Sequence, residues 1–211
     1  MTRLLTLASM ALLVLLTGCS PHYVSAAMEV GEPGLVQILL RDQRIGGNRA
    51  SVLAADLLYC YPPTGEVIIV PAGYVTDFAS VPDGLGRVLE QYGDSIEAAI
   101  VHDWLYAVGE PGRKAWADDL FRYALAEQGV TATDRWTKWI GVTVGGGRSY
   151  GNASEWDERF WSKDGAGPVS PPFAKPRSAV VARVNRCNEI TARREARTFI
   201  DKHGSHTWPR A

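Results

Sequence analysis

His102 and Asp103 are the adjacent residues in this chain whose types best suit acid–base or metal chemistry. They lie in the apolar run 98–106, which contains no helix breaker and predicts a helix. Adjacent side chains on a helix point about 100° apart, so one can face a cleft while the other meets a different partner. Apolar neighbours lower the pKa of an imidazole and keep it neutral, as a general base or a metal ligand requires. The alternative is a core histidine bonded to a backbone carbonyl.

Asp118, on the next predicted helix at 113–128, is the expected partner of His102. It lies three residues before Phe121 and shares its face, which draws Asp118 inward and leaves Asp119 toward solvent. A buried carboxylate needs a partner, and the imidazole of the preceding helix offers one. A carboxylate that orients an imidazole occurs at metal sites and also in buried structural networks. If the chain is catalytic, we expect His102 and Asp118 to be its catalytic residues.

The loop at 71–82 adds further polar groups beside these helices. Polar residues alternate there with apolar ones, and buried Asp and Ser side chains in such loops usually bond backbone N–H groups and fix the turn. The other interpretation makes Asp77 and Asp103 metal ligands. Besides His102 and Asp118, the predicted cluster contains Thr76, Asp77, Ser80, Asp103 and Tyr106.

Three motifs, taken in order, resemble those of the family called domain of unknown function 1353, which is frequent in phages and bacterial genomes. The motifs are Pro71-Ala-Gly-Tyr-Val-Thr-Asp-Phe-Ala-Ser-Val-Pro82, His102-Asp-Trp-Leu-Tyr106 and Lys114-Ala-Trp-Ala-Asp118-Asp-Leu-Phe121. The resemblance covers about Leu35 to Gly151. It implies that Asp77, Ser80, His102, Asp103 and Asp118 belong together, and it implies no activity. The chain differs from the family in its glycine run at 145–147 and in its two terminal segments.

The His-Asp-x-x-Tyr pattern, with an Asp on the next antiparallel helix, also resembles the active-site helices of secreted phospholipases A2. The resemblance implies that His102 is a general base, Asp103 a calcium ligand and Asp118 the group that orients the imidazole. It implies a hydrolase, assisted by calcium, that acts on an envelope lipid or ester. The disulfide pattern of those enzymes and their glycine-rich calcium loop are missing from this sequence.

The first 18 residues have the order of a secretory signal peptide, with Arg3 before the apolar run 4–16. That run is too short for an ordinary membrane span. Leu16-Thr-Gly-Cys19 resembles the bacterial lipobox, which implies that Cys19 is lipidated and that Ser20 directs the protein to the outer membrane, facing the periplasm. A plain signal peptide with an incidental cysteine is the alternative.

The rest of the chain predicts an α+β fold, in which a small antiparallel sheet precedes a helical hairpin and further helices. Strands are expected at 35–40 and 66–70, on either side of the segment 52–61, which suits a strand or a short helix. Further helices are expected from Thr133 and from 178 to 203. The predicted regions are a tether at 19–34, a globular domain at 35–167, a proline-rich linker at 168–177 and a basic helix with its tail at 178–211.

Charge and cysteine content bear on partners and compartment. Residues 19–174 carry 12 Lys or Arg against 20 Asp or Glu, whereas residues 175–211 carry 9 against 3. The basic tail therefore docks on the body, on anionic lipid or on a partner, or is simply a solvated helix face. In the oxidising periplasm, Cys60 and Cys187 either form a disulfide or stay buried thiols. Nucleic-acid binding is not expected, because the basic tail contains no motif of a known nucleic-acid-binding fold.

Two functions remain open on the sequence. One is a non-catalytic envelope lipoprotein whose polar cluster is a buried hydrogen-bond network, with a phage component or another envelope protein as partner. The other is the His-Asp hydrolase. A cleft lined by His102 and Asp118 favours the hydrolase, whereas burial of the whole cluster favours the network.

Overall fold

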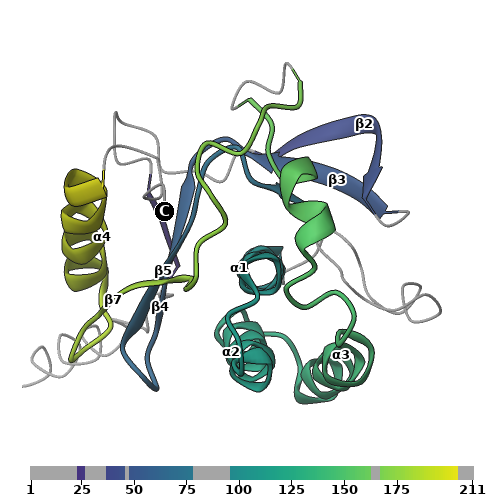
Figure 1. Ribbon diagram of the computed structural model, residues 1–211. Helices are drawn as coiled ribbons and strands as arrows, with labels where there is room; N and C mark the ends of the chain where they lie inside the picture. The colour runs from purple at the N-terminus through teal and green to yellow at the C-terminus, as the bar shows by residue number, and fades with distance from the viewer. Residues whose placement is uncertain (1–22, 27–36, 46–47, 78–95, 163–166, 204–211) are drawn as a thin grey trace, which may run out of the picture.

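A computed structural model describes residues 23–26, 37–45, 48–77, 96–162 and 167–203 of the chain, and it has the predicted α+β fold (Figure 1). The strands are β1 (Tyr23–Ala26), β2 (Gln37–Ile45), β3 (Asn48–Leu53), β4 (Asp56–Tyr61), β5 (Glu66–Val70), β6 (Val75–Thr76) and β7 (Val180–Arg183). The helices are α1 (Ile96–Val108), α2 (Lys114–Glu127), α3 (Ala132–Gly145), the short 3-10 helix η1 (Ala153–Glu158) and α4 (Glu189–His203).

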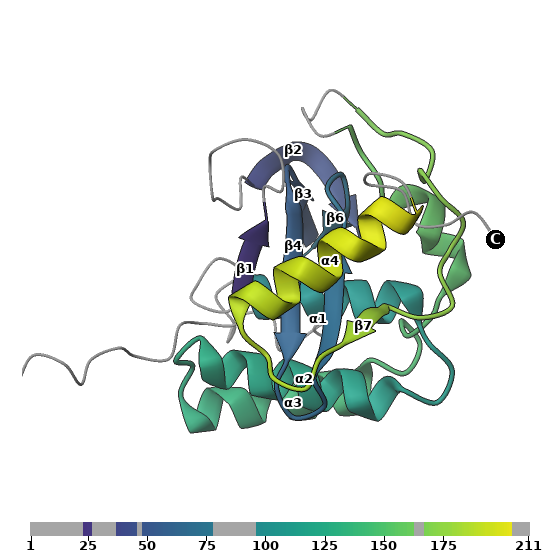
Figure 2. The same cartoon turned by 90° about the vertical axis from the view of Figure 1, so that its left-hand side faces the viewer.

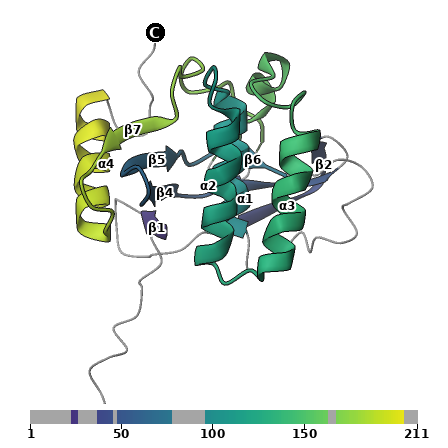
Figure 3. The same ribbon diagram turned by 90° about the horizontal axis from the view of Figure 1, so that it is seen from below.

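Two antiparallel sheets form the centre of the molecule, with strand orders β1-β4-β5-β7 and β2-β3-β6. Helices α1, α2 and α3 lie on one side of the first sheet, and α4 lies on its other side (Figures 1 and 3). Figure 2 shows α4 crossing in front of the strands of that sheet. Because β4 and β5 are covered on both faces, all their residues are buried. Apart from the first residue of each strand, their sequences are therefore mainly apolar and do not alternate between apolar and polar residues.

The sequence Pro62-Pro-Thr-Gly65 predicts a turn, and a turn joins β4 to β5 there. Its glycine has a steric reason. Gly65 has a φ of +67°, and a Cβ there would lie 1.9 Å from the carbonyl oxygen of Val184. Gly65 also accepts a 2.8 Å hydrogen bond from the Val184 N–H. The turn between β4 and β5 is therefore fitted closely against the chain that follows β7.

The segment 178–203 was predicted as one helix, and that prediction is wrong for its first part. Val180–Arg183 forms β7 and pairs with β5, so α4 begins only at Glu189. The open edge of β5 offers β-branched valines a hydrogen-bonding partner that a local pattern does not reveal. The helix buries Ala192 and Ala196 against the sheet, whereas Ile190 is 80% exposed.

Two further predictions change at the N-terminal side. Tyr23–Ala26, placed in the predicted tether, forms β1 and pairs with β4, so these residues belong to the fold. The segment 52–61 divides between β3 and β4, since the chain reverses between Leu53 and Asp56. Residues 87–92, for which the sequence predicts a short helical turn, lie outside the described residues.

The predictions of α1, α2 and the start of α3 agree with the structure to within two residues. α1 carries Glu97 in its first turn, and α2 ends before Gly129, whose φ is +78°. α3 begins at Ala132, one residue earlier than expected from Thr133, because the Thr131 hydroxyl accepts the Asp134 N–H as an N-cap. Among the described helices, none has the length and apolar character needed to cross a bilayer.

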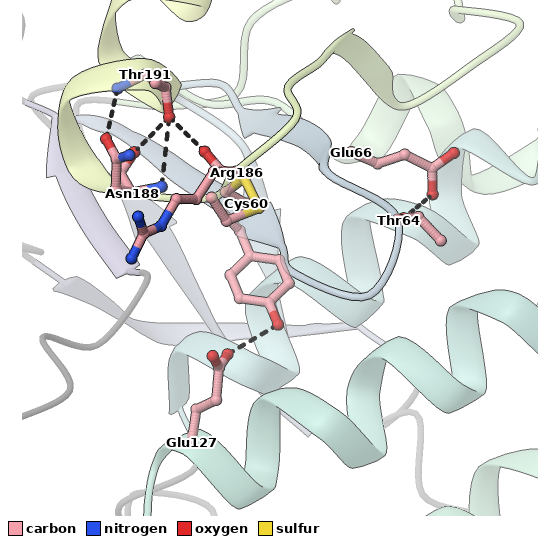
Figure 4. The surroundings of a disulfide bond; sticks show 9 residues. Cys60, Thr64, Glu66, Glu127, Arg186, Asn188 and Thr191 are labelled. Atoms are coloured by element: carbon pink, nitrogen blue, oxygen red, sulfur yellow. Dashed lines mark hydrogen bonds between the residues drawn. A yellow bond between two sulfur atoms is a disulfide. The ribbon is translucent and has the colours of Figure 1, made fainter.

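A disulfide joins Cys60 of β4 to Cys187 in the turn between β7 and α4, across 127 residues of chain (Figure 4). A buried carboxylate strengthens the same connection. The side chain of Glu66, which is 1% exposed, accepts hydrogen bonds at 2.8 Å from both Arg113, the residue before α2, and Arg183 of β7. The C-terminal segment is thus fixed to the body covalently, by strand pairing and by charge.

Candidate functional site

His102 and Asp103 occupy one turn of α1 but face different partners, as the 100° step of a helix requires. His102 belongs to a group with Tyr106, Lys114 and Asp118, which we call the helix hub. Asp103 belongs to a group with Thr76, Asp77 and Arg159, which we call the loop cluster.

Asp118 is the centre of the helix hub. Its Oδ1 accepts a 2.7 Å hydrogen bond from the Tyr106 hydroxyl and lies 3.3 Å from His102 Nε2. Its Oδ2 accepts a 2.8 Å hydrogen bond from Lys114 Nζ. The predicted partnership of His102 with Asp118 is therefore present, and Tyr106 and Lys114 complete the coordination of the carboxylate.

The helix hub extends to the C-terminal end of α3. The carbonyl oxygen of Val142 accepts hydrogen bonds from Lys114 Nζ at 3.0 Å and from the Tyr106 hydroxyl at 3.2 Å. A cation near the last carbonyls of a helix also favours the helix dipole. Gly146 follows directly, and a Cβ there would lie 2.4 Å from the Tyr106 hydroxyl. The glycine run at 145–147 thus lets α3 end against the hub.

Burial controls the protonation of the helix hub. His102 is 2% exposed, and its ring packs between those of Tyr106 and Phe121, at 4.2 and 4.6 Å between centroids. This burial lowers the pKa of His102, although the Asp118 carboxylate opposes the shift, so the imidazole is neutral. Burial alone raises the pKa of Asp118, but hydrogen bonds from His102, Lys114 and Tyr106 hold it below its ordinary value.

The loop cluster lies on the other side of α1. Thr76 donates its hydroxyl hydrogen to Asp103 Oδ2, and Arg159 Nη1 lies 3.7 Å from Asp77 Oδ1. Backbone pairing places the arginine. The Val75 N–H donates to the Arg159 carbonyl at 2.9 Å, and the Trp161 N–H donates to the Gly73 carbonyl at 2.8 Å. All four side chains are buried.

Asp103 is the carboxyl group with the most unusual titration in the described part of the chain. Burial and the neighbouring charge of Asp77 raise its pKa to about 8, against the weaker effects of Arg159 and Thr76. Asp103 is therefore mostly protonated at neutral pH and shares a hydrogen bond with Asp77.

A small cavity reaches the loop cluster from the surface. It has a volume of about 10 Å³, which is close to the space one water molecule occupies. Its lining includes Asp103, Ser149, Asn152, Trp156 and Arg159. The cavity is too small for a lipid or ester substrate, since drug-sized ligands occupy at least ~300 Å³.

The donor set does not fit the calcium site that Asp77 and Asp103 were predicted to form. Calcium takes six to eight oxygen ligands, and carboxylates bind it in their charged form. Here burial and the charge of Asp77 raise the pKa of Asp103, and a guanidinium already lies beside Asp77. Within the described ranges, no group of three His, Cys, Asp or Glu side chains has the arrangement of a metal site.

The structure brings together most of the predicted site residues but in two groups rather than one. Ser80 and Cys19 lie outside the described residues. Lys114 and Arg159 were missed by the sequence reasoning. Lys114 lies four residues before Asp118, a spacing that signals an ion pair on a helix. No local signal marks Arg159, because its position follows from long-range backbone pairing.

Residues 51–142 match the model of a family described as protein of unknown function (DUF1353). The match runs from β3 to α3, and it supports the family resemblance of this part of the α+β domain. β1, β2, β7 and α4 lie wholly or mainly outside the matched stretch. No curated protein and no solved structure matches the chain.

Proposed function

We propose that this chain is an exported, lipid-anchored protein of the cell envelope whose folded domain is a non-catalytic module. Its two polar groups serve as a hydrogen-bond network that holds helices, loop and sheet together. The proposal joins the lipobox-like Leu16-Thr-Gly-Cys19 to the burial of the helix hub, and the burial is the observation that carries it.

Burial supports a structural role for His102 and Asp118. They are 2% and 1% exposed; His102 Nε2 faces Asp118, and the Asp118 oxygens also face Tyr106 and Lys114. A general base must reach the proton it abstracts within hydrogen-bonding distance. The covered imidazole has no such access, and Asp118 is shared among three donors, which suits a network linking three helices.

The disulfide supports export. Disulfides persist in oxidising compartments such as the periplasm and are rare in the cytosol. Cys60 and Cys187 form one across 127 residues, which leaves Cys19 for the acyl chain.

Mass spectrometry of the chain isolated from cells tests the anchor. We expect cleavage before Cys19 and acyl groups on its sulfur and amine, and we expect Cys19→Ala to prevent both. An unmodified cysteine would refute the anchor.

A second measurement tests the non-catalytic domain. His102→Ala is compared with wild type for the free energy of unfolding and for hydrolysis of phospholipid and ester substrates in calcium. We expect no activity in either protein and a clear loss of stability in the variant. Hydrolysis by wild type that His102→Ala abolishes without unfolding would establish the hydrolase instead.

A protein partner, either a phage component or another envelope protein, remains a prediction. We expect it at α3, where Trp136, Ile140 and Val144 repeat every four residues and are 51%, 49% and 81% exposed. A photo-crosslinking residue at Ile140 should capture a protein of the envelope or of an infecting phage. Adducts with lipid alone would contradict this placement.

A further inference from the structure

The basic C-terminal segment has one face on the body and one face toward solvent. From Lys175 to His203 it carries eight Lys or Arg against three Asp or Glu, whereas residues 19–174 carry a net charge of −8. α4 uses its alanine face, Ala192 and Ala196, to cover the sheet. Of the basic side chains, Lys175 and Arg183 bind Gly151 and Glu66 of the body, whereas Arg186, Arg194 and Arg197 are exposed to solvent.

The outward face of α4 combines cations with an exposed apolar residue. Ile190, Arg194 and Arg197 follow at spacings of four and three residues, which places them on one side of the helix. All three are exposed, Ile190 by 80%. Arg186 is exposed at the turn before the helix, beside the disulfide (Figure 4). Such a surface suits the headgroup region of an anionic bilayer.

The fold places this face close to the proposed anchor. Cys19 is four residues before Tyr23, the first residue of β1, so even a fully extended chain keeps the two Cα atoms within ~14 Å of each other. β1 is an edge strand that contacts α4 (Figure 2). A lipid on Cys19 therefore brings α4 to the bilayer, while the net negative charge of the body disfavours other orientations.

We infer that the outward face of α4 lies against anionic phospholipid headgroups and sets the orientation of the domain on the membrane. This inference rests on the proposed lipid anchor. It directs α3 away from the bilayer, because α3 lies on the opposite side of the sheet (Figure 1).

Nitroxide labels on the full acylated chain test the orientation. Thr198→Cys places a label on α4 and Thr133→Cys places one on α3; both positions are exposed. In vesicles containing phosphatidylglycerol, we expect the α4 label to become severalfold less accessible to a water-soluble nickel complex than in pure phosphatidylcholine. The α3 label should stay equally accessible in both. An α4 label that is equally accessible in both vesicles, or a shielded α3 label, overturns the inference.

Charge reversal provides a matched comparison. Arg186→Glu with Arg194→Glu removes cations from the α4 side, and Lys138→Glu with Arg148→Glu makes the same charge change on the α3 side. The α4-side pair of substitutions should abolish the shielding of the α4 label, and the α3-side pair should leave that shielding unchanged. High salt, at which the Debye length falls to about 3 Å, should act like the first pair. Shielding that survives the first pair refutes the assignment to anionic lipid.

The two proposals fail in different ways. If the nitroxide reagent labels the Cys19 thiol, Cys19 is not acylated, and the proposed lipid anchor is wrong. The same unacylated chain is then mixed with phosphatidylglycerol vesicles and sedimented. Salt-sensitive binding, weakened about fivefold for each arginine removed, still supports the α4 face, whereas no binding refutes it.

Discussion

The hydroxyl of Tyr106 donates a 2.7 Å hydrogen bond to Asp118 across the contact between α1 and α2. The same hydroxyl lies 3.2 Å from the Val142 carbonyl at the end of α3. One buried side chain thus touches the central carboxylate of the helix hub and the third helix, and the stability of the helical layer should depend on it.

Asp118→Asn should destabilise the protein by about 2–4 kcal/mol at neutral pH, because it removes a buried charge that three donors face. Asp119→Asn is the matched control, since the neighbouring carboxylate is half exposed and forms a long pair with Arg122. Urea unfolding of both variants measures the difference. An equal loss of unfolding free energy in the two variants would contradict the central role of Asp118 in the helix hub.

The pH dependence of Asp118 follows from its depressed pKa. A carboxyl group whose pKa is lower in the folded protein contributes stability that is present above its unfolded pKa of about 4 and is lost as pH falls through the folded value. We expect wild type and Asp119→Asn to share this acid-labile contribution and Asp118→Asn to lack it. Unfolding free energies measured between about pH 2 and 6 test this.

Asp103 should give the opposite pH dependence. Its pKa is raised to about 8, so the folded state holds more protons than the unfolded state between about pH 4 and 8. Stability from this group is present below the unfolded pKa and is lost as pH rises, by at most about 1.4 kcal/mol per pH unit. Asp103→Asn should flatten this decline. Exposed Asp157→Asn is the control, and an unchanged slope in Asp103→Asn would contradict the raised pKa.

Gly146→Ala should destabilise the end of α3 by about 1–3 kcal/mol, since the new Cβ would lie 2.4 Å from the Tyr106 hydroxyl and 2.5 Å from the Val142 carbonyl. Gly147→Ala is the control, because no atom lies within 4 Å of a Cβ there. Thermal unfolding should separate the two variants. A harmless Gly146→Ala would mean that the helix end is not packed against the hub.

Removal of the disulfide should lower stability by about 2–5 kcal/mol, chiefly by releasing a constraint on the unfolded chain. Either single variant, Cys60→Ala or Cys187→Ala, should lose about as much as the pair. A reducing agent should destabilise wild type but leave the double variant unchanged. Equal unfolding curves for oxidised and reduced wild type would refute this contribution.

Local patterns in the sequence predicted much of this protein. They predicted β5, its turn, the three helices of the helical layer and the partnership of His102 with Asp118. The separation of His102 from Asp103 also follows from sequence, because the helical step applies wherever the helix lies.

Only the tertiary structure decided which partners the buried charges find and where the C-terminal helix begins. Arg159 reaches Asp77 because residues 159–161 pair with 73–75, and Val180–Arg183 forms a strand because β5 has an edge to share. Hydrogen bonding along an edge and pairing of buried charges depend on residues far apart in the chain. A local pattern of apolar and polar residues carries no information about them.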